Sequence, residues 1–286
     1  IEEIDAMFSA HDMPLKKENF IKIFANWEPK SSNILKTSKE LNLGIDSFVY
    51  IDDNIFEIEE VKSVYPEIQS HRFDFENPKK SLNILKNIKG FRSWSLSKED
   101  LIKTSQYQDE KKREIHRAKV PNINNYLLSL EMKLEFGVNR ISQIKRISNL
   151  TNKTNQFNLT TNRYSEIEIE NLIKKNHIFD FRLTDRFGDM GVVGVVIVID
   201  NNIDTFLLSC RALGRKIEVQ MLKVIYDKFK NNLKALYVPS KKNNQVKFFF
   251  ESNGFLITKT DIDGMKRYKM ESGPSENKFI KISEVK

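Results

Sequence analysis

The sequence is almost devoid of cysteine, with Cys210 as the single thiol among 286 residues. One thiol excludes an intrachain disulfide framework, so we expect a reducing, cytoplasmic setting. The Asn-x-Thr triplets at Asn149, Asn152 and Asn158 are therefore expected to be ordinary polar sequence rather than glycan acceptors.

Long apolar runs, glycine and proline are also scarce. No uninterrupted apolar stretch approaches the roughly 20 residues of a membrane span, and no secretory signal opens the chain, so we expect no membrane partner. Ten glycines and seven prolines leave little room for long linkers. The chain is long enough for two domains, and its 40% hydrophobic content with 20 phenylalanines supports buried cores.

Positive charge is abundant, with a formal net charge of +8. A basic balance is compatible with nucleic acid, but no recognition motif or basic stripe interleaved with aromatic residues accompanies it. We therefore do not expect a nucleic-acid partner. Solvated lysines, or attraction to an acidic partner protein, explain the charge better.

Residues 1–92 show an α/β pattern, with helices expected at 1–8, 31–41, 57–64 and 79–89 and a strand at 47–51. Asp52 and Asp53 follow that strand, at the edge where open α/β sheets bind ligands. Two adjacent acids can ligate Mg²⁺ and leave room for a substrate phosphate, which Lys30 could hold. The alternative is that Asp52, Asp53 and Asn54 only cap the next helix.

The strings NWEPKSSNI (26–34) and LNLGIDSFVYIDDN (41–54) resemble the distal half of a haloacid-dehalogenase-type (HAD) phosphatase domain, in the version found in FkbH-like proteins. The resemblance implies that Lys30 supports the phosphoryl group and that Asp52, with Asp53, completes a Mg²⁺ site. The superfamily also needs a nucleophilic aspartate in a D-x-D motif, but the one D-x-D here lies in DIDG (261–264), which reads as a hairpin turn. We therefore expect that a native N-terminal segment is missing or that this half is degenerate, and that this chain lacks phosphatase activity.

Residues 93–121 are expected to form a charged helical linker, capped by Ser97 and solvated along QYQDEKKREIHRAK. From residue 122 the order becomes mixed α+β, with Ser142 expected to cap one helix and Ser165 another, the latter in a capping box with Glu168. The helices are expected at 124–130, 142–150, 165–172, 217–229 and 244–252, and the strands at 132–136, 177–183, 192–199, 204–209, 236–238, 255–260 and 266–270.

The turn RALGRK (211–216) follows Cys210, between the strand at 204–209 and the helix at 217–229. Gly214 permits close backbone approach, free N–H groups of the first helical turn favour an anion, and Arg211, Arg215 and Lys216 add positive charge. This pattern predicts a phosphate cradle beside a thiol that the cations favour as thiolate. The alternative is that Cys210 is a small buried hydrophobe.

This order of elements resembles the GCN5-related N-acetyltransferase (GNAT) fold, and NNQVKFFFESNGF (243–255) resembles its later aromatic helix and GF pair. The resemblance implies that Arg211, Gly214 and Lys216 occupy the R/Q-x-x-G-x-G/A turn, which holds the pyrophosphate and pantetheine arm of acyl-CoA. Lys216 departs from the usual small residue. The predicted fold class is thus α/β: a partial HAD-like (Rossmannoid) α/β segment at 1–92, the linker at 93–121, and a GNAT-like mixed α+β acyltransferase domain at 122–286.

Two further strings, LTNKTNQFNLTTNRYSE (150–166) and DRFGDMGVVGVV (185–196), are rich in polar or turn-forming residues. One interpretation is a pocket for a polyhydroxylated or phosphorylated substrate. The other is loop and turn chemistry, in which Asn, Thr and Asp side chains satisfy the backbone. In the second string, Gly188, Asp189 and Gly191 are expected to form a turn. The candidate substrate-binding residues are Asn155, Gln156, Asn158, Thr160, Arg163 and Asp189.

Together these strings, in order from about residue 26 to residue 255, resemble the FkbH-like family. The resemblance implies an acyl (glyceryl) transferase with a HAD-type phosphatase half. Such a protein takes a glyceryl unit from 1,3-bisphosphoglycerate and loads it onto the phosphopantetheine thiol of an acyl carrier protein, in polyketide-type pathways such as methoxymalonyl carrier formation. Cys210 is the candidate thioester nucleophile, and Lys30 and Asp52 would serve dephosphorylation. Two alternatives stay open: an acyl-CoA-dependent N-acetyltransferase, and a non-catalytic module that docks a carrier protein.

Overall fold

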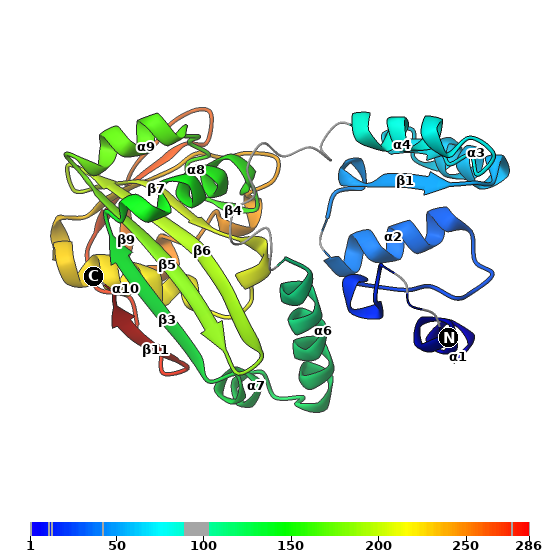
Figure 1. The fold of residues 1–286 in the computed structure, drawn as a ribbon. Coiled ribbons are helices and arrows are strands. Elements are labelled where there is room, and N and C mark those ends of the chain that lie inside the picture. The colour runs from blue at the N-terminus through cyan, green and yellow to red at the C-terminus, as the bar shows by residue number, and fades with distance from the viewer. Residues whose placement is uncertain are drawn as a thin grey trace. The chain divides into compact units, whose positions relative to one another are not determined.

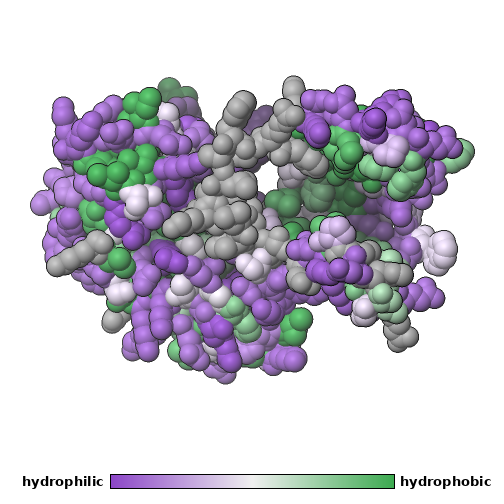
Figure 2. All heavy atoms as spheres, viewed as in Figure 1, coloured by the Kyte–Doolittle hydropathy of each residue, from purple (hydrophilic) through white to green (hydrophobic). Residues whose placement is uncertain are grey.

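The computed structural model describes residues 2–10, 12, 14–41, 43–88, 103–275 and 277–285 (Figure 1). Figure 2 shows the same view with each residue coloured by its hydropathy. The chain divides into two compact units, Ile1–Gln108 and Asp109–Lys286. The fold is mixed α/β, as expected. The predicted helix start at Ser97 and the expected boundary near residue 92 lie outside the described residues.

Unit 1 contains a small βαβ arrangement, in which two parallel strands are joined by a helix. Helix α3 begins after Asn54, whose side chain accepts a hydrogen bond from the N–H of Phe56, and α4 has Pro78 at its start and Asn77 as its cap. The described elements are α1 (Glu2–Ala10), α2 (Lys30–Leu41), β1 (Val49–Asp52), α3 (Ile55–Val64), β2 (Gln69–Arg72) and α4 (Pro78–Asn87).

Helix α6 (Lys103–Lys119) crosses from unit 1 into unit 2, and the described part of unit 2 then forms a nine-stranded sheet. The strand order is β11-β3-β5-β6-β7-β8-β10-β9, with β4 paired to β7. The elements after α6 are α7 (Ile123–Ser129), β3 (Met132–Val138), α8 (Ile144–Lys153), β4 (Phe157–Asn158), α9 (Glu166–Ile173), β5 (His177–Asp185), β6 (Gly188–Ile199), β7 (Asn202–Leu208), α10 (Ile217–Phe229), β8 (Lys234–Tyr237), β9 (Phe255–Thr260), β10 (Lys266–Met270) and β11 (Ile280–Glu284).

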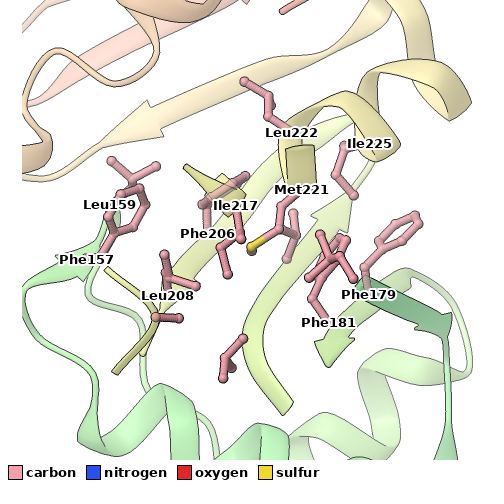
Figure 3. Close-up of a cluster of buried hydrophobic side chains, with 14 of the residues drawn as sticks. Phe157, Leu159, Phe179, Phe181, Phe206, Leu208, Ile217, Met221, Leu222 and Ile225 are labelled. Atoms are coloured by element: carbon pink, nitrogen blue, oxygen red, sulfur yellow. The ribbon is translucent and has the colours of Figure 1, made fainter. Parts of the chain in front are cut away.

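Two hydrophobic cores cover the two faces of this sheet, because successive side chains of a strand point to opposite faces. On β6, Val195 and Ile197 join the core under α8 and α9, whereas Val196 and Val198 join the core under α10. Figure 3 shows the second core, where α10 lies on phenylalanines of β5 and β7. The central strands β5, β6 and β7 are therefore largely buried on both faces, and β6 reads as a nearly continuous apolar run.

The packing of α10 depends on Gly194 in β6. A Cβ at this position would lie 2.6 Å from Sδ and Cε of Met221, which is closer than real carbon contacts allow. The missing side chain thus lets α10 approach the sheet closely, and this fixes where the helix begins next to the end of β7.

The parallel pair β7 and β8 is short: within the described residues it extends only over Asn202–Lys234 and Ile203–Ala235. Beyond that point the chain segment 157–159 lies between the two strands. Its β4 residues pair with Leu207 and Leu208, and the carbonyl of Leu159 accepts a hydrogen bond from the N–H of Val238 at 2.8 Å. The gap between the diverging strands is therefore filled by the protein's own backbone.

Most of the predicted elements of unit 2 are confirmed, including the capping box of Ser165 with Glu168 and the hairpin turn at DIDG. Three details were wrong. Ser142 caps no helix, because it lies in a 3₁₀ turn (Ile141–Gln143) that leads directly into α8.

The predicted helix at 244–252 consists of two 3₁₀ turns, Asn244–Val246 and Glu251–Asn253. Asn and Phe are poor helix formers, and packing of the phenylalanines against β4 and β7 decides the local path. Finally, the turn expected at Gly188–Gly191 lies earlier: Gly188 and Asp189 belong to β6, and Asp185 accepts hydrogen bonds from the N–H groups of Phe187 and Gly188.

No helix among the described residues is long and apolar enough to cross a membrane.

Candidate functional site

Cys210 lies directly after β7 and is exposed. It begins a 3₁₀ turn, Cys210–Ala212, in which the N–H of Leu213 donates to the carbonyl of Cys210 at 3.2 Å. The residue before it is fixed to the sheet, since the N–H of Ser209 donates to the carbonyl of Val193 at 2.7 Å. The interpretation of Cys210 as a buried hydrophobe is therefore wrong, and its thiol is presented to solvent from a firmly held strand end.

The turn after Cys210 has left-handed backbone at two positions, Gly214 (φ 78°) and Lys216 (φ 59°). A Cβ at Gly214 would meet no atom within 4 Å, so open space adjoins this part of the turn. Lys216 is the N-cap of α10, and its carbonyl accepts a hydrogen bond from Nδ2 of Asn277 at 2.7 Å. Gly214 and Lys216 are exposed, so the turn offers room for close approach, whereas Ile217 at the start of α10 is buried. That the N–H groups of the first helical turn bind an anion stays a prediction.

Arg215 differs from the expected exposed cation, since it is buried with 6% exposure. Its guanidinium donates to the carbonyls of Arg211 (2.6 Å) and Leu213 (3.4 Å) and to both carboxylate oxygens of Glu110 (2.9 and 2.8 Å). Its Nε is buried and has no partner among the described residues. Arg215 therefore holds the turn from inside, and its charge is balanced by Glu110. Its predicted contact with a pantetheine arm stays a prediction.

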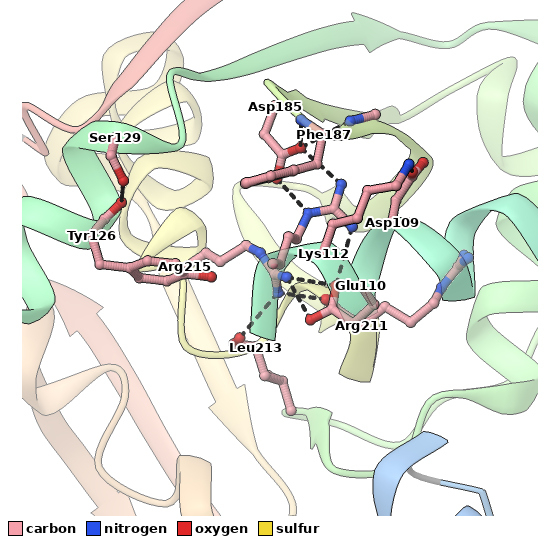
Figure 4. A network of polar contacts seen from close by, with 12 residues as sticks. Asp109, Glu110, Lys112, Tyr126, Ser129, Asp185, Phe187, Arg211, Leu213 and Arg215 are labelled. Carbon is pink, nitrogen blue, oxygen red and sulfur yellow. Dashed lines mark hydrogen bonds and ion pairs between the residues drawn. The ribbon is translucent and has the colours of Figure 1, made fainter. Parts of the chain in front are cut away.

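The turn is part of a chain of ion pairs in unit 2, in which Arg113, Asp185 and Arg215 are buried and Glu110 is 37% exposed (Figure 4). Arg113 of α6, with 2% exposure, donates to Oδ2 (2.6 Å) and Oδ1 (2.8 Å) of Asp185 and to Glu110 (3.2 Å). Burial opposes the charge of Arg113, but the bonds and charge of Asp185 and Glu110 prevail and raise its pKa.

Arg113 of α6 binds Asp185 at the β5–β6 hairpin, and Glu110 of α6 binds Arg215 in the turn after Cys210. Helix α6 therefore connects the hairpin with this turn. The expectation of a solvated connecting helix is wrong for this part of α6. Asp109 and Glu110 lie four and three residues before Arg113, a spacing typical of exposed pairs on a helix, so the sequence carried no signal for the burial of Arg113.

The polar string at 150–166 has mainly structural contacts. Asn158 is buried, and its side chain joins the carbonyl of Thr154 (3.2 Å) to the N–H of Thr161 (2.9 Å). The guanidinium of Arg163 donates to the carbonyls of Thr151 and Thr154 (2.8 Å) and to Oδ1 of Asn155 (2.5 Å).

Burial lowers the pKa of Arg163. Gln156 is exposed, whereas the hydroxyl of Thr160 is buried and has no partner among the described residues. The loop interpretation of the string is confirmed for Asn158 and Arg163, and substrate binding by these residues stays a prediction.

Asn243, which the sequence analysis missed, fixes this string beside the turn. It is fully buried, and its Nδ2 donates to the carbonyls of Asn158 and Val238, both at 2.9 Å. Its Oδ1 accepts from the N–H of Ser240 (2.8 Å) and the hydroxyl of Tyr237 (3.2 Å). The segment between β7 and β8 is therefore clamped in place. A single Asn in a lysine-rich loop carries no pattern that predicts such a role.

Asp189 lies on β6 rather than in the turn region, and it pairs with Arg182 of β5. Its Oδ1 also accepts from the N–H of Gly191 at 2.8 Å. Burial raises the pKa of Asp189, but the bonds of Arg182 and Gly191 outweigh this effect, so the net pKa is lowered. These contacts are those of a paired structural carboxylate.

In unit 1, Asp52 and Lys30 lie within electrostatic reach of each other at the end of β1. Asp52 accepts from the hydroxyl of Tyr50 (2.6 Å) and the N–H of Asn54 (2.9 Å). Burial acts to raise the pKa of Asp52, yet these hydrogen bonds and the charge of Lys30 lower it overall. The same contact, together with burial, raises the pKa of Tyr50. Asp52 is thus held as a carboxylate.

The fit of this site to Mg²⁺ rests on few ligands. Among the described residues, no group of three His, Cys, Asp or Glu side chains is placed to hold a metal ion. Asp53 is exposed, and its carbonyl accepts from Nε of Arg72 at 3.0 Å. Mg²⁺ is often held by one or two carboxylates and completes its shell with water and phosphate, and a magnesium site at Asp52 and Asp53 stays a prediction. The helix-capping alternative is confirmed for Asn54.

Neither a scan against protein-family models nor a search of curated proteins finds a match for this chain.

Proposed function

We propose that this protein is an FkbH-like acyl transferase that loads a glyceryl unit from 1,3-bisphosphoglycerate onto the phosphopantetheine thiol of an acyl carrier protein. The observation that carries the proposal is the exposed Cys210 at the rigid end of β7, next to a left-handed turn with open space at Gly214. A strand end, a thiol and a helix start follow one another within ten residues, from Leu208 to Ile217. Such a turn suits a nucleophile that meets a phosphate-bearing substrate.

The chemistry needs only this thiol and the activated acyl donor. The Cys210 thiolate attacks the carbonyl carbon of the acyl phosphate, a C–S bond forms, and the carbonyl C–O bond breaks as inorganic phosphate leaves with its electron pair. The carrier thiol, after losing its proton to solvent, then attacks the thioester carbonyl. The new C–S bond forms on the carrier as the Cys210 thiolate leaves.

An acyl-CoA-dependent N-acetyltransferase is less well supported. An extended ligand arm would need free backbone groups between β7 and β8, and the described groups there are already paired with residues 157–159. Transfer between thiols at the exposed Cys210 requires no insertion between these strands. The thioester route therefore agrees better with the filled gap.

The second phosphate of the donor would be handled in unit 1. There Lys30 is suited to hold the phosphate, and Asp52 with Asp53 would bind Mg²⁺, which would neutralise charge on the phosphate as it is lost. The nucleophilic aspartate that the family resemblance requires is absent from this sequence. We therefore expect this chain to perform acyl transfer without phosphatase activity.

The test is covalent capture of the acyl group. The wild-type protein is mixed with 1,3-bisphosphoglycerate, and intact and peptide mass spectrometry should find a phosphoglyceryl thioester on Cys210 that hydroxylamine removes. Cys210→Ser and Cys210→Ala should show no thioester. An adduct of undiminished amount in either variant rules Cys210 out. A second assay with acetyl-CoA and amine acceptors tests the alternative, an N-acetyltransferase. Catalytic acetylation of an amine would establish that alternative.

A non-catalytic carrier-docking module is the second candidate, favoured by the sparse acidic site of unit 1. Carrier binding by a wild-type protein that forms no Cys210 adduct from any acyl phosphate would support it.

A further inference from the structure

Three loop segments at one edge of the unit 2 sheet contain only positive charges. Residues 151–163, 209–216 and 239–248 include no Asp or Glu. Their cations are Lys153, Arg163, Arg211, Arg215, Lys216, Lys241, Lys242 and Lys247. We call this set the cationic edge.

The structure brings these segments together although they are far apart in sequence. The carbonyl of Phe206 accepts from the N–H of Leu159, and the carbonyl of Leu159 accepts from the N–H of Val238, so three backbones form one row. Because β7 and β8 are parallel, the loops that follow them leave the sheet at the same edge, and Asn243 ties the second loop to Asn158. The cationic edge therefore surrounds the side on which Cys210 is presented.

Several lysines of this edge remain available to a partner. Lys241, Lys242 and Lys247 are exposed, and no ion pair joins any of them to a carboxylate of the described residues. Lys216 is exposed too, and its charge acts on the nearby carboxylate of Glu218. Arg215, in contrast, is neutralised from inside by Glu110. The charge that a partner meets is thus mainly that of lysines on the two loops after β7 and β8.

An apolar anchor lies within the same edge. The ring of Phe248 is 60% exposed, with the ammonium groups of Lys247 and Lys266 at 5.4 and 5.1 Å from its centroid. Its neighbour Phe249 contacts Phe157 at 5.3 Å, and Phe157 pairs with Leu208, two residues before Cys210. A large exposed aromatic ring among lysines is a typical centre of a protein interface.

We propose that the cationic edge, with Phe248 as its apolar anchor, docks the acidic face of the carrier protein and so places the carrier's thiol at Cys210. This inference rests on the proposed function, and it adds where the partner binds. Charge complementarity selects an acidic amphipathic surface. Within the three segments 151–163, 209–216 and 239–248, Phe248 is the single exposed aromatic residue, so this surface lacks the series of stacking rings that single-stranded nucleic acid uses.

The experiment measures binding of a recombinant apo acyl carrier protein, whose serine carries no pantetheine arm, so that docking is separated from chemistry. In Lys241→Glu/Lys242→Glu we expect the Kd to rise at least about tenfold, because two attractive contacts become repulsive. Lys174→Glu/Lys175→Glu is the matched control, since this exposed pair follows α9 at the opposite edge of the sheet and changes the net charge equally. Its Kd should stay within about twofold of the wild type.

Phe248→Ser tests the anchor and should raise the Kd about tenfold, with little change in its dependence on salt. The rate at which an uncharged methanethiosulfonate modifies Cys210 should be unchanged in all variants, which shows that the turn is intact. Equal Kd values for Lys241→Glu/Lys242→Glu and its control would overturn the proposal. So would preferential binding of a single-stranded oligonucleotide over the carrier. Adduct formation on Cys210 is measured separately, so a failed docking surface is distinguishable from a failed acyl-transfer function.

Discussion

The buried pair of Arg113 and Asp185 gives the sharpest test of how the Cys210 turn is supported. We consider Arg113→Met, which keeps an unbranched side chain but removes the guanidinium. The side chains of Arg113 and Asp185 are 2% and 0% exposed, so solvent cannot replace the lost contacts. The substitution leaves Asp185 as a buried carboxylate without its cation, and it removes one of the two arginine partners of Glu110.

The expected cost follows from these contacts. Removing one partner of a buried ion pair typically destabilises a protein by about 3–5 kcal/mol. Asp185 retains hydrogen bonds from the N–H groups of Phe187 (2.9 Å) and Gly188 (3.1 Å), so we expect the lower end, about 3 kcal/mol. In the double variant Arg113→Met/Asp185→Asn the stranded charge is gone, and we expect a coupling free energy of about 2 kcal/mol. Lys223→Met, at an exposed pair with Asp227, should cost at most about 1 kcal/mol.

The assay must report on unit 2 alone. Both tryptophans, Trp27 and Trp94, precede Asp109, so their fluorescence does not follow unfolding of this unit. Hydrogen exchange of peptides from the buried strands β6 and β7, measured by mass spectrometry, gives the opening free energy directly. A loss below about 1 kcal/mol for Arg113→Met, or costs that simply add in the double variant, would refute a buried, coupled ion pair.

Two further predictions concern the turn itself. Gly214→Ala should destabilise unit 2 by about 1 kcal/mol, because φ of 78° is strained for any L side chain although the site has space, and it should slow acylation of Cys210 by obstructing ligand approach. Hydrogen exchange and adduct kinetics measure the two effects, and unchanged acylation would remove Gly214 from the substrate's path. Glu218 in the first turn of α10 has its pKa raised above 4.5 by burial, and its Oε2 has no partner among the described residues. Between pH 4.5 and the pKa of Glu218 in the folded state, the folded protein therefore holds a proton that the unfolded chain has released. The free energy of unfolding of the wild type should fall as the pH rises through this range. Glu218→Gln should lack this slope. Parallel pH profiles with no difference between the two proteins would contradict this assignment.

The long apolar strands of unit 2 were predictable because their burial on both faces leaves an unmistakable run, such as VVGVVIVI in β6. Strands β2 (QSHR), β4 (FN) and β11 (IKISE) were missed, since none of them is a long apolar run. β4 exists because the gap between β7 and β8 exposes backbone groups that residues 157–159 can pair with. That demand arises only from the tertiary structure, and no local pattern encodes it.

The candidate site shows the same limit. The position of the turn and of its glycine was predictable from the sequence, because strand, turn and helix signals follow one another locally. Exposure of Cys210 was not, and the structure decides it. From the sequence we expected Arg215 to be an exposed cation, because an arginine beside a predicted anion site normally binds the anion. The structure shows that Glu110, 105 positions away in sequence, takes that charge.

The way the turn is held has a consequence for what it can bind. Arg215 bonds the carbonyls of Arg211 and Leu213 from within, and Asn277 bonds the carbonyl of Lys216 from the other side, so the backbone around Gly214 is fixed before any ligand arrives. A fixed backbone lowers the ordering cost of binding. Because Glu110 already balances Arg215, however, the turn offers less net positive charge than its sequence implies, and a doubly charged pyrophosphate gains correspondingly less there. The positive potential of this side comes instead from exposed lysines on the loops, which act over the longer range that suits a protein partner. Rigid backbone at the thiol and diffuse charge around it are what the proposed docking of a large acidic carrier requires.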